Sequence, residues 1–174
     1  MKGSNQIIKF TPIEEIFSEE EIQKMMMEIQ PMLHECFIHS CLFAEKMAKD
    51  YPSIEYHEGM FSKLLLFHAW NSVVKDGKRL YFDFSGYFLE KKYKVERLHY
   101  AIMLRTYKPK EIYRLIFING IDTCQIQWDG TYKNYIGKQF RKNIEIIDRM
   151  LSLEEKAEKH EEKHSEILCP CVSF

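Results

Sequence analysis

Hydrophobic residues recur with helical spacing near the N-terminus of the chain. Ser18 followed three residues later by Glu21 is a capping-box motif, which marks the start of a helix. The apolar face of this helix is predicted to comprise Ile22, Met25, Met26 and Ile29. Pro31 ends the helix or begins the next one, because proline is tolerated in the first turn of a helix and not in its interior. Residues 7–10, which precede the motif, predict a short strand.

A second helix is predicted from about His34 to Asp50. Its apolar positions recur with the period of a helix and are Phe37, Ile38, Cys41, Leu42 and Met47. Tyr51-Pro52 ends this helix, since the residue before a proline is disfavoured in helical geometry.

The middle of the chain changes to the pattern of strands. Residues 54–61 and 65–74 are rich in β-branched and aromatic residues, which favour extended structure. Asp76-Gly77 predicts a two-residue hairpin turn, and residues 79–84 form the returning strand. Residues 98–105 predict one more strand.

Helices are expected again in the C-terminal third. Pro109 begins a predicted helix that Gly120 ends, and residues 123–128 are expected to be extended. A further helix is predicted from Tyr132 to about Met150. Residues 152–166 are almost all charged, which predicts a helical extension or a free tail.

These elements predict an α+β fold, with N-terminal helices packed on an antiparallel sheet and further helices after it. A chain of 174 residues can form one domain with a sizeable core, which we expect to span residues 1–150. Residues 151–174 would form a charged helical or disordered tail.

Composition and charge narrow the classes of function. The formal net charge of −1 gives no general attraction to nucleic acid. Basic residues gather between 86 and 149, which predicts a solvated face or a docking surface for an acidic partner. Neither a signal peptide nor an apolar run of membrane-spanning length is present, so we expect a cytoplasmic protein. Five cysteines, an odd number, are then expected to stay reduced, and a reduced thiol can act as a nucleophile.

Cys36 lies in the first turn of the second predicted helix. Unpaired backbone N–H groups and the positive end of the helix dipole meet there, and both favour the thiolate, which is the reactive form of cysteine. The N–H of Cys36 can also point at a developing oxyanion. The alternative is a small core residue, since free cysteines are often buried.

His68 and Asp83 are brought together by the predicted hairpin. A two-residue turn at Asp76-Gly77 places Trp70 opposite Asp83, and His68 opposite Ser85. His68 and Trp70 share one face of their strand, so Asp83 is a diagonal neighbour of His68 on that face. A carboxylate there can accept the imidazole N–H and stabilise the imidazolium. The alternative is a satisfied histidine beside an exposed aspartate, and a one-residue slip in register would separate the two side chains.

Four segments carry a family pattern: Glu35-Cys36-Phe37 with Ala44, Tyr56-His57-Glu58-Gly59, Phe67-His68-Ala69-Trp70-Asn71 and Tyr81-Phe82-Asp83-Phe84. A histidine followed by Ala-Trp, with an aspartate fifteen residues later, is similar to the transglutaminase-like branch of the papain-like cysteine hydrolase superfamily. The resemblance covers about residues 30–85. Because the gap between Cys36 and His68 is short, a compact bacterial or phage-type member is the better comparison.

The resemblance implies a papain-like core and a cysteine-dependent acyl-transfer enzyme that acts on a protein or peptide amide without a cofactor. Cys36 would be the nucleophile, His68 the base and Asp83 the orienting carboxylate. Gln30 matches an oxyanion-hole glutamine, and Trp70 would line the substrate channel or, alternatively, belong to the core. The superfamily also contains inactive members, so the alternative function is a catalytically silent fold that acts as an interaction or regulatory protein.

Other residues allow further interpretations. His34 and His39 flank Cys36 and are alternative bases. Four residues near the C-terminus have the types that bind zinc: His160, His164, Cys169 and Cys171. The last four residues also fit a loose prenylation pattern at Cys171. A charged tail with neither property is the remaining interpretation.

Overall fold

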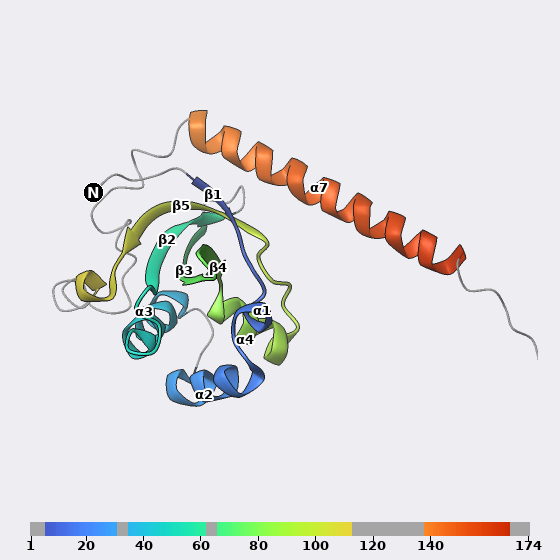
Figure 1. Ribbon diagram of the computed structural model, residues 1–174. Coiled ribbons are helices and arrows are strands. Elements are labelled where there is room, and N and C mark those ends of the chain that lie inside the picture. Colours follow the sequence, from blue (N-terminus) through green and yellow to red (C-terminus); the bar gives the residue numbers. More distant parts are fainter. Residues whose placement is uncertain (1–5, 31–34, 62–65, 113–137, 168–174) are drawn as a thin grey trace, which may run out of the picture.

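The structure, a computed structural model, describes residues 6–30, 35–61, 66–112 and 138–167, with the side chains of 138–140, 155 and 157–167 excepted (Figure 1). Its elements in chain order are β1 (Gln6–Lys9), α1 (Ile13–Ile16), α2 (Glu19–Ile29), α3 (Cys36–Met47), β2 (Glu55–Phe61), β3 (Leu66–Lys75), β4 (Lys78–Phe82), α4 (Phe84–Tyr93), β5 (Tyr100–Tyr107) and α7 (Lys138–Ile167). Helices combined with an antiparallel sheet confirm the α+β prediction.

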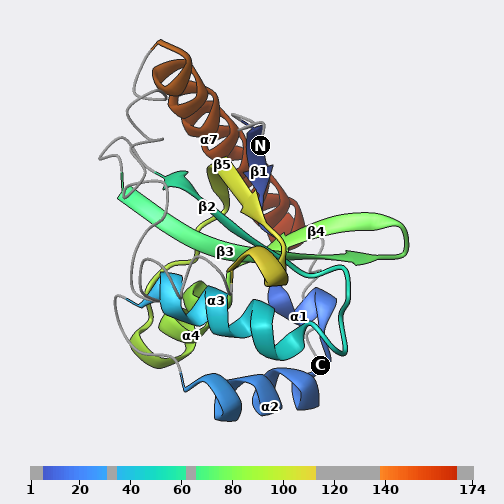
Figure 2. The same ribbon diagram turned by 90° about the vertical axis from the view of Figure 1, so that its left-hand side faces the viewer.

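The five strands form one curled sheet in the order β1-β5-β2-β3-β4, and every neighbouring pair is antiparallel. The two edges of the sheet meet at Phe10, which follows β1 and forms a parallel bridge with Tyr81 of β4. Beside this bridge, the Thr11 N–H donates to the Tyr81 carbonyl at 2.7 Å. The sheet therefore has an inner and an outer face. The helices pack around the outside of this curled sheet, with α1 to α4 gathered at one side of the curl and α7 at the opposite side (Figures 1 and 2).

Helix α3 packs on the outer face of β3 through a polar seam. The Ser40 hydroxyl donates to the Ala69 carbonyl at 3.0 Å, and the Asn71 side-chain amide donates to the Ser40 carbonyl at 2.9 Å. Beside this seam, buried aromatic rings join α1, α3 and the end of β4; they are Phe17, Phe43, Phe82 and Phe84. This packing fixes the start of α3 against the strand that carries His68.

The inner face of the sheet holds a row of stacked rings. Trp70 is fully buried, and its ring lies between those of His57 and His68 at centroid distances of 6.2 Å, with interplanar angles of 24° and 28°. Phe10 meets Trp70 edge-on at 5.5 Å. Gly59 lies opposite His68 in the ladder, next to a β-bulge. The shared face predicted for His68 and Trp70 is confirmed.

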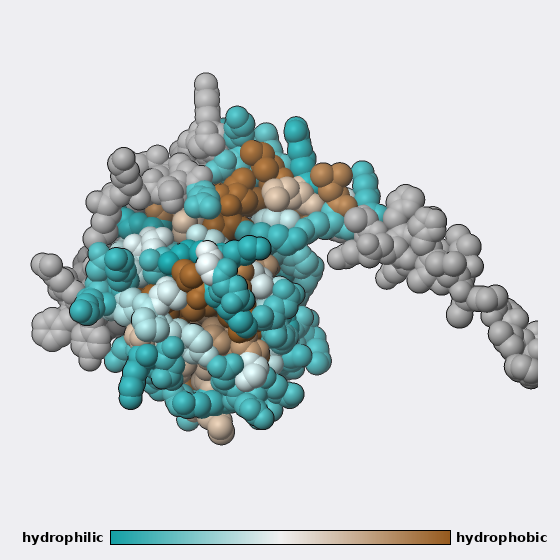
Figure 3. All heavy atoms as spheres, viewed as in Figure 1, coloured by the Kyte–Doolittle hydropathy of each residue, from teal (hydrophilic) through white to brown (hydrophobic). Residues whose placement is uncertain are grey.

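Helix α7 covers the outer face of β5 with its first part. Ile144 and Ile147 are buried there against Ile102 and Leu104. Further along the helix, Glu154 pairs with Lys9 and accepts the Tyr100 hydroxyl at 2.6 Å. One of the hydrophobic areas in Figure 3 lies along α7. The helix continues through residue 150 without a break, so the predicted boundary between domain and tail falls inside α7.

Several sequence predictions are confirmed with small shifts in their ends. The capping box forms, with the Ser18 N–H donating to Glu21 at 2.7 Å and the Glu21 N–H donating to the Ser18 hydroxyl at 3.3 Å. The strand pairs on either side of Asp76-Gly77 follow the predicted register from Lys75 and Lys78 onward. Both turn residues have positive φ, as a primed hairpin turn requires.

Two predictions about helices need correction. No helix was predicted over residues 84–93, where α4 stands. The predicted apolar face of α3 is also only partly right, since Phe37, Ile38 and Leu42 are half-buried whereas the polar residues His39 and Ser40 are buried. The reason is that hydrogen bonds satisfy these polar side chains, which hydrophobic spacing does not reveal.

Part of the C-terminal prediction lies outside the described residues. Residues 109–112 are helical, which agrees with a helix that starts at Pro109. The predicted end of that helix lies outside the described residues, as do the predicted extended segment 123–128 and residues 132–137 of the last predicted helix. Among the described residues, none of the helices combines the length and the apolar composition that crossing a membrane requires.

Candidate active site

Cys36 is the first residue of α3 and is half-buried. The N-cap residue Glu35 makes no capping hydrogen bond with its side chain, and the first helical bond runs from the His39 N–H to the Glu35 carbonyl at 2.9 Å. The sulfur therefore lies at the end of the helix where backbone N–H groups lack helical partners. This is the position predicted for Cys36.

The imidazole of His68 is bonded to Asp83, with 2.7 Å between Nε2 and Oδ2. The predicted register leads to this contact, but the predicted pairs of Trp70 with Asp83 and of His68 with Ser85 do not form. Strand β4 ends at Phe82, and Asp83 is the N-cap of α4, whose Gly86 N–H donates to Oδ1 at 2.9 Å. Both carboxylate oxygens of Asp83 therefore accept hydrogen bonds, one from His68 and one from Gly86.

Cys36 contacts the same imidazole. The Cys36 side chain is one of the groups that raise the pKa of the His68 ring, and because Nε2 is bound to Asp83, Nδ1 is the nitrogen that remains available to the sulfur. Burial lowers the pKa of His68, but the charges and hydrogen bonds of Asp83 and Cys36 outweigh burial and raise this pKa to about 10. His68 is consequently an imidazolium at neutral pH, held between the sulfur and the carboxylate.

Aromatic rings hold the His68 ring in place. Trp70 stacks on it from the neighbouring position of the same face, and Phe61 of β2 meets it edge-on at 5.6 Å. Only 8% of the His68 surface is exposed, so water competes little with its two polar partners.

Trp70 and Gln30 are the two other residues predicted to belong to the site. Trp70 is fully buried in the stacked row and belongs to a core cluster, which agrees with the core alternative, while a role for it in a substrate channel stays a prediction. Gln30 is exposed and ends α2 in the left-handed conformation, its N–H donating to the Met26 carbonyl at 3.0 Å. An oxyanion role for Gln30 stays a prediction.

His39 is a site neighbour whose surroundings the sequence did not reveal. Its Nδ1 lies 3.2 Å from the Ser85 hydroxyl, and its Nε2 lies 3.5 Å from Oε2 of Glu35. Burial lowers the pKa of His39, while the carboxylates of Glu35 and Asp83 act in the opposite direction. Ser85 belongs to α4, which was not predicted, so no sequence signal linked these residues.

His57 and Glu58 lie on opposite faces of β2, and both are buried. The imidazole of His57 lies 2.9 Å from the Thr106 hydroxyl and 2.7 Å from the Ser72 hydroxyl. Burial, with a smaller contribution from Arg79, lowers the pKa of His57 to about 3, so this ring is neutral. His57 therefore supports the stacked row as a core residue.

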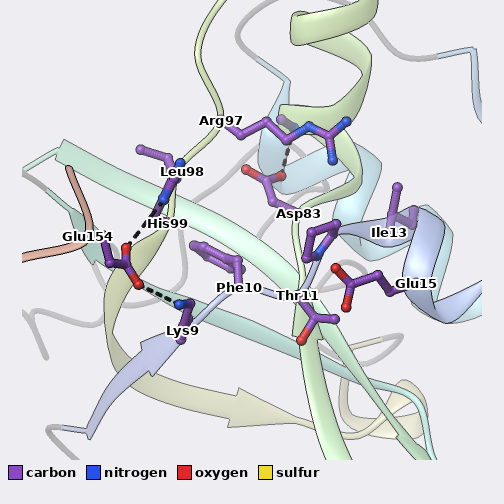
Figure 4. Close-up of a pocket in the computed structure, with 12 residues that line it drawn as sticks. Lys9, Phe10, Thr11, Ile13, Glu15, Asp83, Arg97, Leu98, His99 and Glu154 are labelled. Atoms are coloured by element: carbon purple, nitrogen blue, oxygen red, sulfur yellow. Dashed lines mark hydrogen bonds and ion pairs between the residues drawn. The ribbon is translucent and has the colours of Figure 1, made fainter. Parts of the chain in front are cut away.

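A cavity of about 460 Å³ reaches Asp83 from the side of the β1–α1 connection. Asp83 lines this cavity together with Phe10, Arg97 and Glu15 (Figure 4). Arg97 is already paired with Glu14 and Glu90. The cavity therefore offers a mixed apolar and charged wall beside the carboxylate that orients His68.

The remaining sequence hypotheses concern metals and lipids. Among the described residues, no group of three or more His, Cys, Asp and Glu side chains could hold a metal ion. The side chains of His160 and His164, like Cys169 and Cys171, lie outside that part of the chain. The zinc and prenylation hypotheses therefore stay predictions.

Comparison of the chain with protein-family models, with curated proteins and with solved structures returned no match. The resemblance to transglutaminase-like enzymes thus stays a prediction.

Proposed function

We propose that this protein is a cysteine-dependent acyl-transfer enzyme with a papain-like core, acting on a peptide or isopeptide amide. The observation that carries the proposal is the placement of His68, whose imidazole is hydrogen-bonded to Asp83 and whose pKa is raised by both Asp83 and the side chain of Cys36. A nucleophile bonded to a base, and a base oriented by a third group, form the arrangement that nucleophilic catalysis requires.

The proposed acylation step depends on the charges of Cys36, His68 and Asp83. The Cys36 thiolate attacks the carbonyl carbon of the amide, and the negative charge that develops on the carbonyl oxygen meets the N–H groups at the start of α3. The His68 imidazolium gives its proton to the departing nitrogen, the carbon–nitrogen bond breaks, and a thioester remains on Cys36. Asp83 holds the imidazole in the tautomer that can donate from the side of the sulfur.

Deacylation returns the enzyme to its starting state. Neutral His68 takes a proton from a water molecule or an amine, which attacks the thioester carbon. The carbon–sulfur bond breaks, and Cys36 leaves as the thiolate beside the restored imidazolium. Attack by water gives hydrolysis or deamidation, and attack by an amine gives transamidation.

Thiol labelling tests the nucleophile. Iodoacetamide at near-neutral pH should alkylate Cys36 much faster than the other four cysteines, as measured by peptide mass spectrometry. Cys36→Ala should abolish the fast phase, while Cys41→Ser should keep it, because burial and the nearby Glu58 raise the pKa of Cys41. Equal, slow labelling of all five thiols would contradict the proposal.

An activated ester tests acyl transfer itself. With p-nitrophenyl acetate, the protein should release a burst of nitrophenolate equivalent to one Cys36 and then turn over. His68→Asn should remove both phases, and a primary amine such as n-butylamine should speed turnover if transamidation is supported. Fast alkylation of Cys36 without acylation would instead favour a silent fold that serves in interaction or regulation.

A further inference from the structure

His39 joins the two segments that carry the ends of the proposed triad. It contacts Glu35, the residue immediately before Cys36, and Ser85, which lies two residues after Asp83 in the first turn of α4. His39 and Ser85 have exposed fractions of 1% and 4%, so water does not replace these contacts. The imidazole is therefore a buried link between the start of α3 and the start of α4.

The partners of His39 identify its tautomer. A carboxylate can only accept a hydrogen bond, so the Glu35 side chain requires a proton on Nε2 of a neutral ring. Nδ1 is then an acceptor, and the Ser85 hydroxyl donates to it. This neutral tautomer satisfies both contacts at once. Among the described residues, the groups that face the ring include Glu35 from its own helix and Ser85 and Asp83 from the start of α4.

We infer that His39 is a positioning residue, which sets Asp83 against His68 by bridging Glu35 to Ser85. The inference rests on the proposed function for its catalytic meaning. Asp83 reaches His68 from a helix N-cap and not from a strand, so the ladder of β3 and β4 does not fix its place. The link from Ser85 to α3 restrains the first turn of α4 relative to the helix that carries Cys36.

A neutral His39 also suits this place electrostatically. An imidazolium at this position would compete with His68 for the negative charge of Asp83, which already influences His39. Burial opposes that second positive charge, so Asp83 remains available to His68.

Two conservative variants separate the two contacts. In His39→Asn the amide occupies the region of Nδ1, so the Ser85 contact can be kept. In His39→Gln the amide reaches the region of Nε2, so the Glu35 contact can be kept and the Ser85 contact is lost. We expect His39→Gln to lower the pKa of His68, measured by NMR of the imidazole ring, by about one unit and to slow Cys36 labelling about tenfold. His39→Asn should stay within about twofold of the native rate.

Ser85→Ala tests the same link from the other end and removes only a hydroxyl, so it should fold. We expect it to shift the pKa of His68 and the pH profile of labelling as His39→Gln does. Thr106→Val is the matched control, because it removes a hydroxyl from another buried histidine, His57, and should reduce stability without moving the pKa of His68. An unchanged His68 pKa in both His39→Gln and Ser85→Ala would overturn the inference. If native Cys36 labels slowly while these variants still shift the His68 pKa, the proposed function fails and the positioning role stands.

Discussion

The Oδ2 atom of Asp83 lies 2.7 Å from Nε2 of His68, while Oδ1 of the same carboxylate accepts the Gly86 N–H at 2.9 Å. One side chain therefore both caps a helix and orients an imidazole. The contact with the Gly86 N–H needs any good N-cap acceptor, whereas the contact with His68 needs a negative charge. Substitutions at this position can separate the two contributions.

Asp83→Asn should leave the fold intact and weaken the chemistry. Asparagine is as good an N-cap as aspartate, so α4 keeps its first hydrogen bond. The His68 imidazolium loses its counter-charge, so its pKa should fall and the acylation burst should slow on the order of 10²–10⁴-fold. Stopped-flow kinetics with p-nitrophenyl acetate would measure the burst, and a native rate in Asp83→Asn would contradict the orienting role.

Asp83→Ala is the comparison that isolates the cap. It should slow the burst as much as Asp83→Asn and should also reduce the free energy of unfolding by about 1 kcal/mol more, because the cap is lost as well. Urea denaturation followed by circular dichroism gives that difference. Equal stability of the two variants would mean that Asp83 contributes little as a cap.

His68 should make the protein less stable as the solution becomes alkaline. Its pKa is raised to about 10 in the folded protein from an ordinary value near 6.5, so the folded state holds this proton more tightly. The resulting stabilisation is complete below about pH 6.5 and is lost as the pH rises toward 10, by at most about 1.4 kcal/mol per pH unit. Urea midpoints measured between pH 6.5 and 9 should fall more steeply in the native protein than in His68→Asn.

His57 should have the opposite effect on the acid side. Burial lowers its pKa to about 3, so between about pH 6.5 and 3 His57 is protonated in the unfolded chain but neutral in the folded protein. Stability from this residue is complete above pH 6.5 and is lost as the pH falls toward 3. In His57→Asn the urea midpoint should depend less on pH between 6.5 and 4, and an unchanged dependence would contradict a neutral buried His57.

Local signals predicted most of the strands but not the helix after the hairpin. Asp76-Gly77 fixes the register of β3 and β4 because both turn residues adopt positive φ. Helix α4 (Phe84–Tyr93) lacks an amphipathic period and contains Gly86 in its first turn, so hydrophobic spacing does not indicate a helix there. The N-cap type of Asp83 was the one local signal for it.

In the candidate site, too, the contacts set by nearby residues could be predicted, whereas those set by residues distant in sequence could not. The hairpin register predicted that Asp83 lies near His68, although Asp83 makes the contact from the N-cap of α4, and the position of Cys36 was predicted from a helix start. The burial of Trp70 depends on the curl of the sheet, which Phe10 closes far away in sequence. The partners of His39 depend on the placement of α4, so spacing along the chain could not identify them.

Gly59 should tolerate no side chain, in contrast to Gly77. A Cβ at Gly59 would lie 2.1 Å from the Ile102 carbonyl oxygen and 2.5 Å from Cη2 of Trp70, and the backbone oxygen cannot yield. Gly59→Ala should therefore reduce the free energy of unfolding by about 3 kcal/mol or more.

At the hairpin turn, Gly77→Ala is the control: its added Cβ meets no atom within 4 Å, but the residue has a φ of +74°, which should reduce the free energy of unfolding by about 1–2 kcal/mol. Because Trp70 stacks on His68, Gly59→Ala should also slow Cys36 alkylation, whereas Gly77→Ala should not; equal urea midpoints and equal alkylation rates would contradict this account of the inner face.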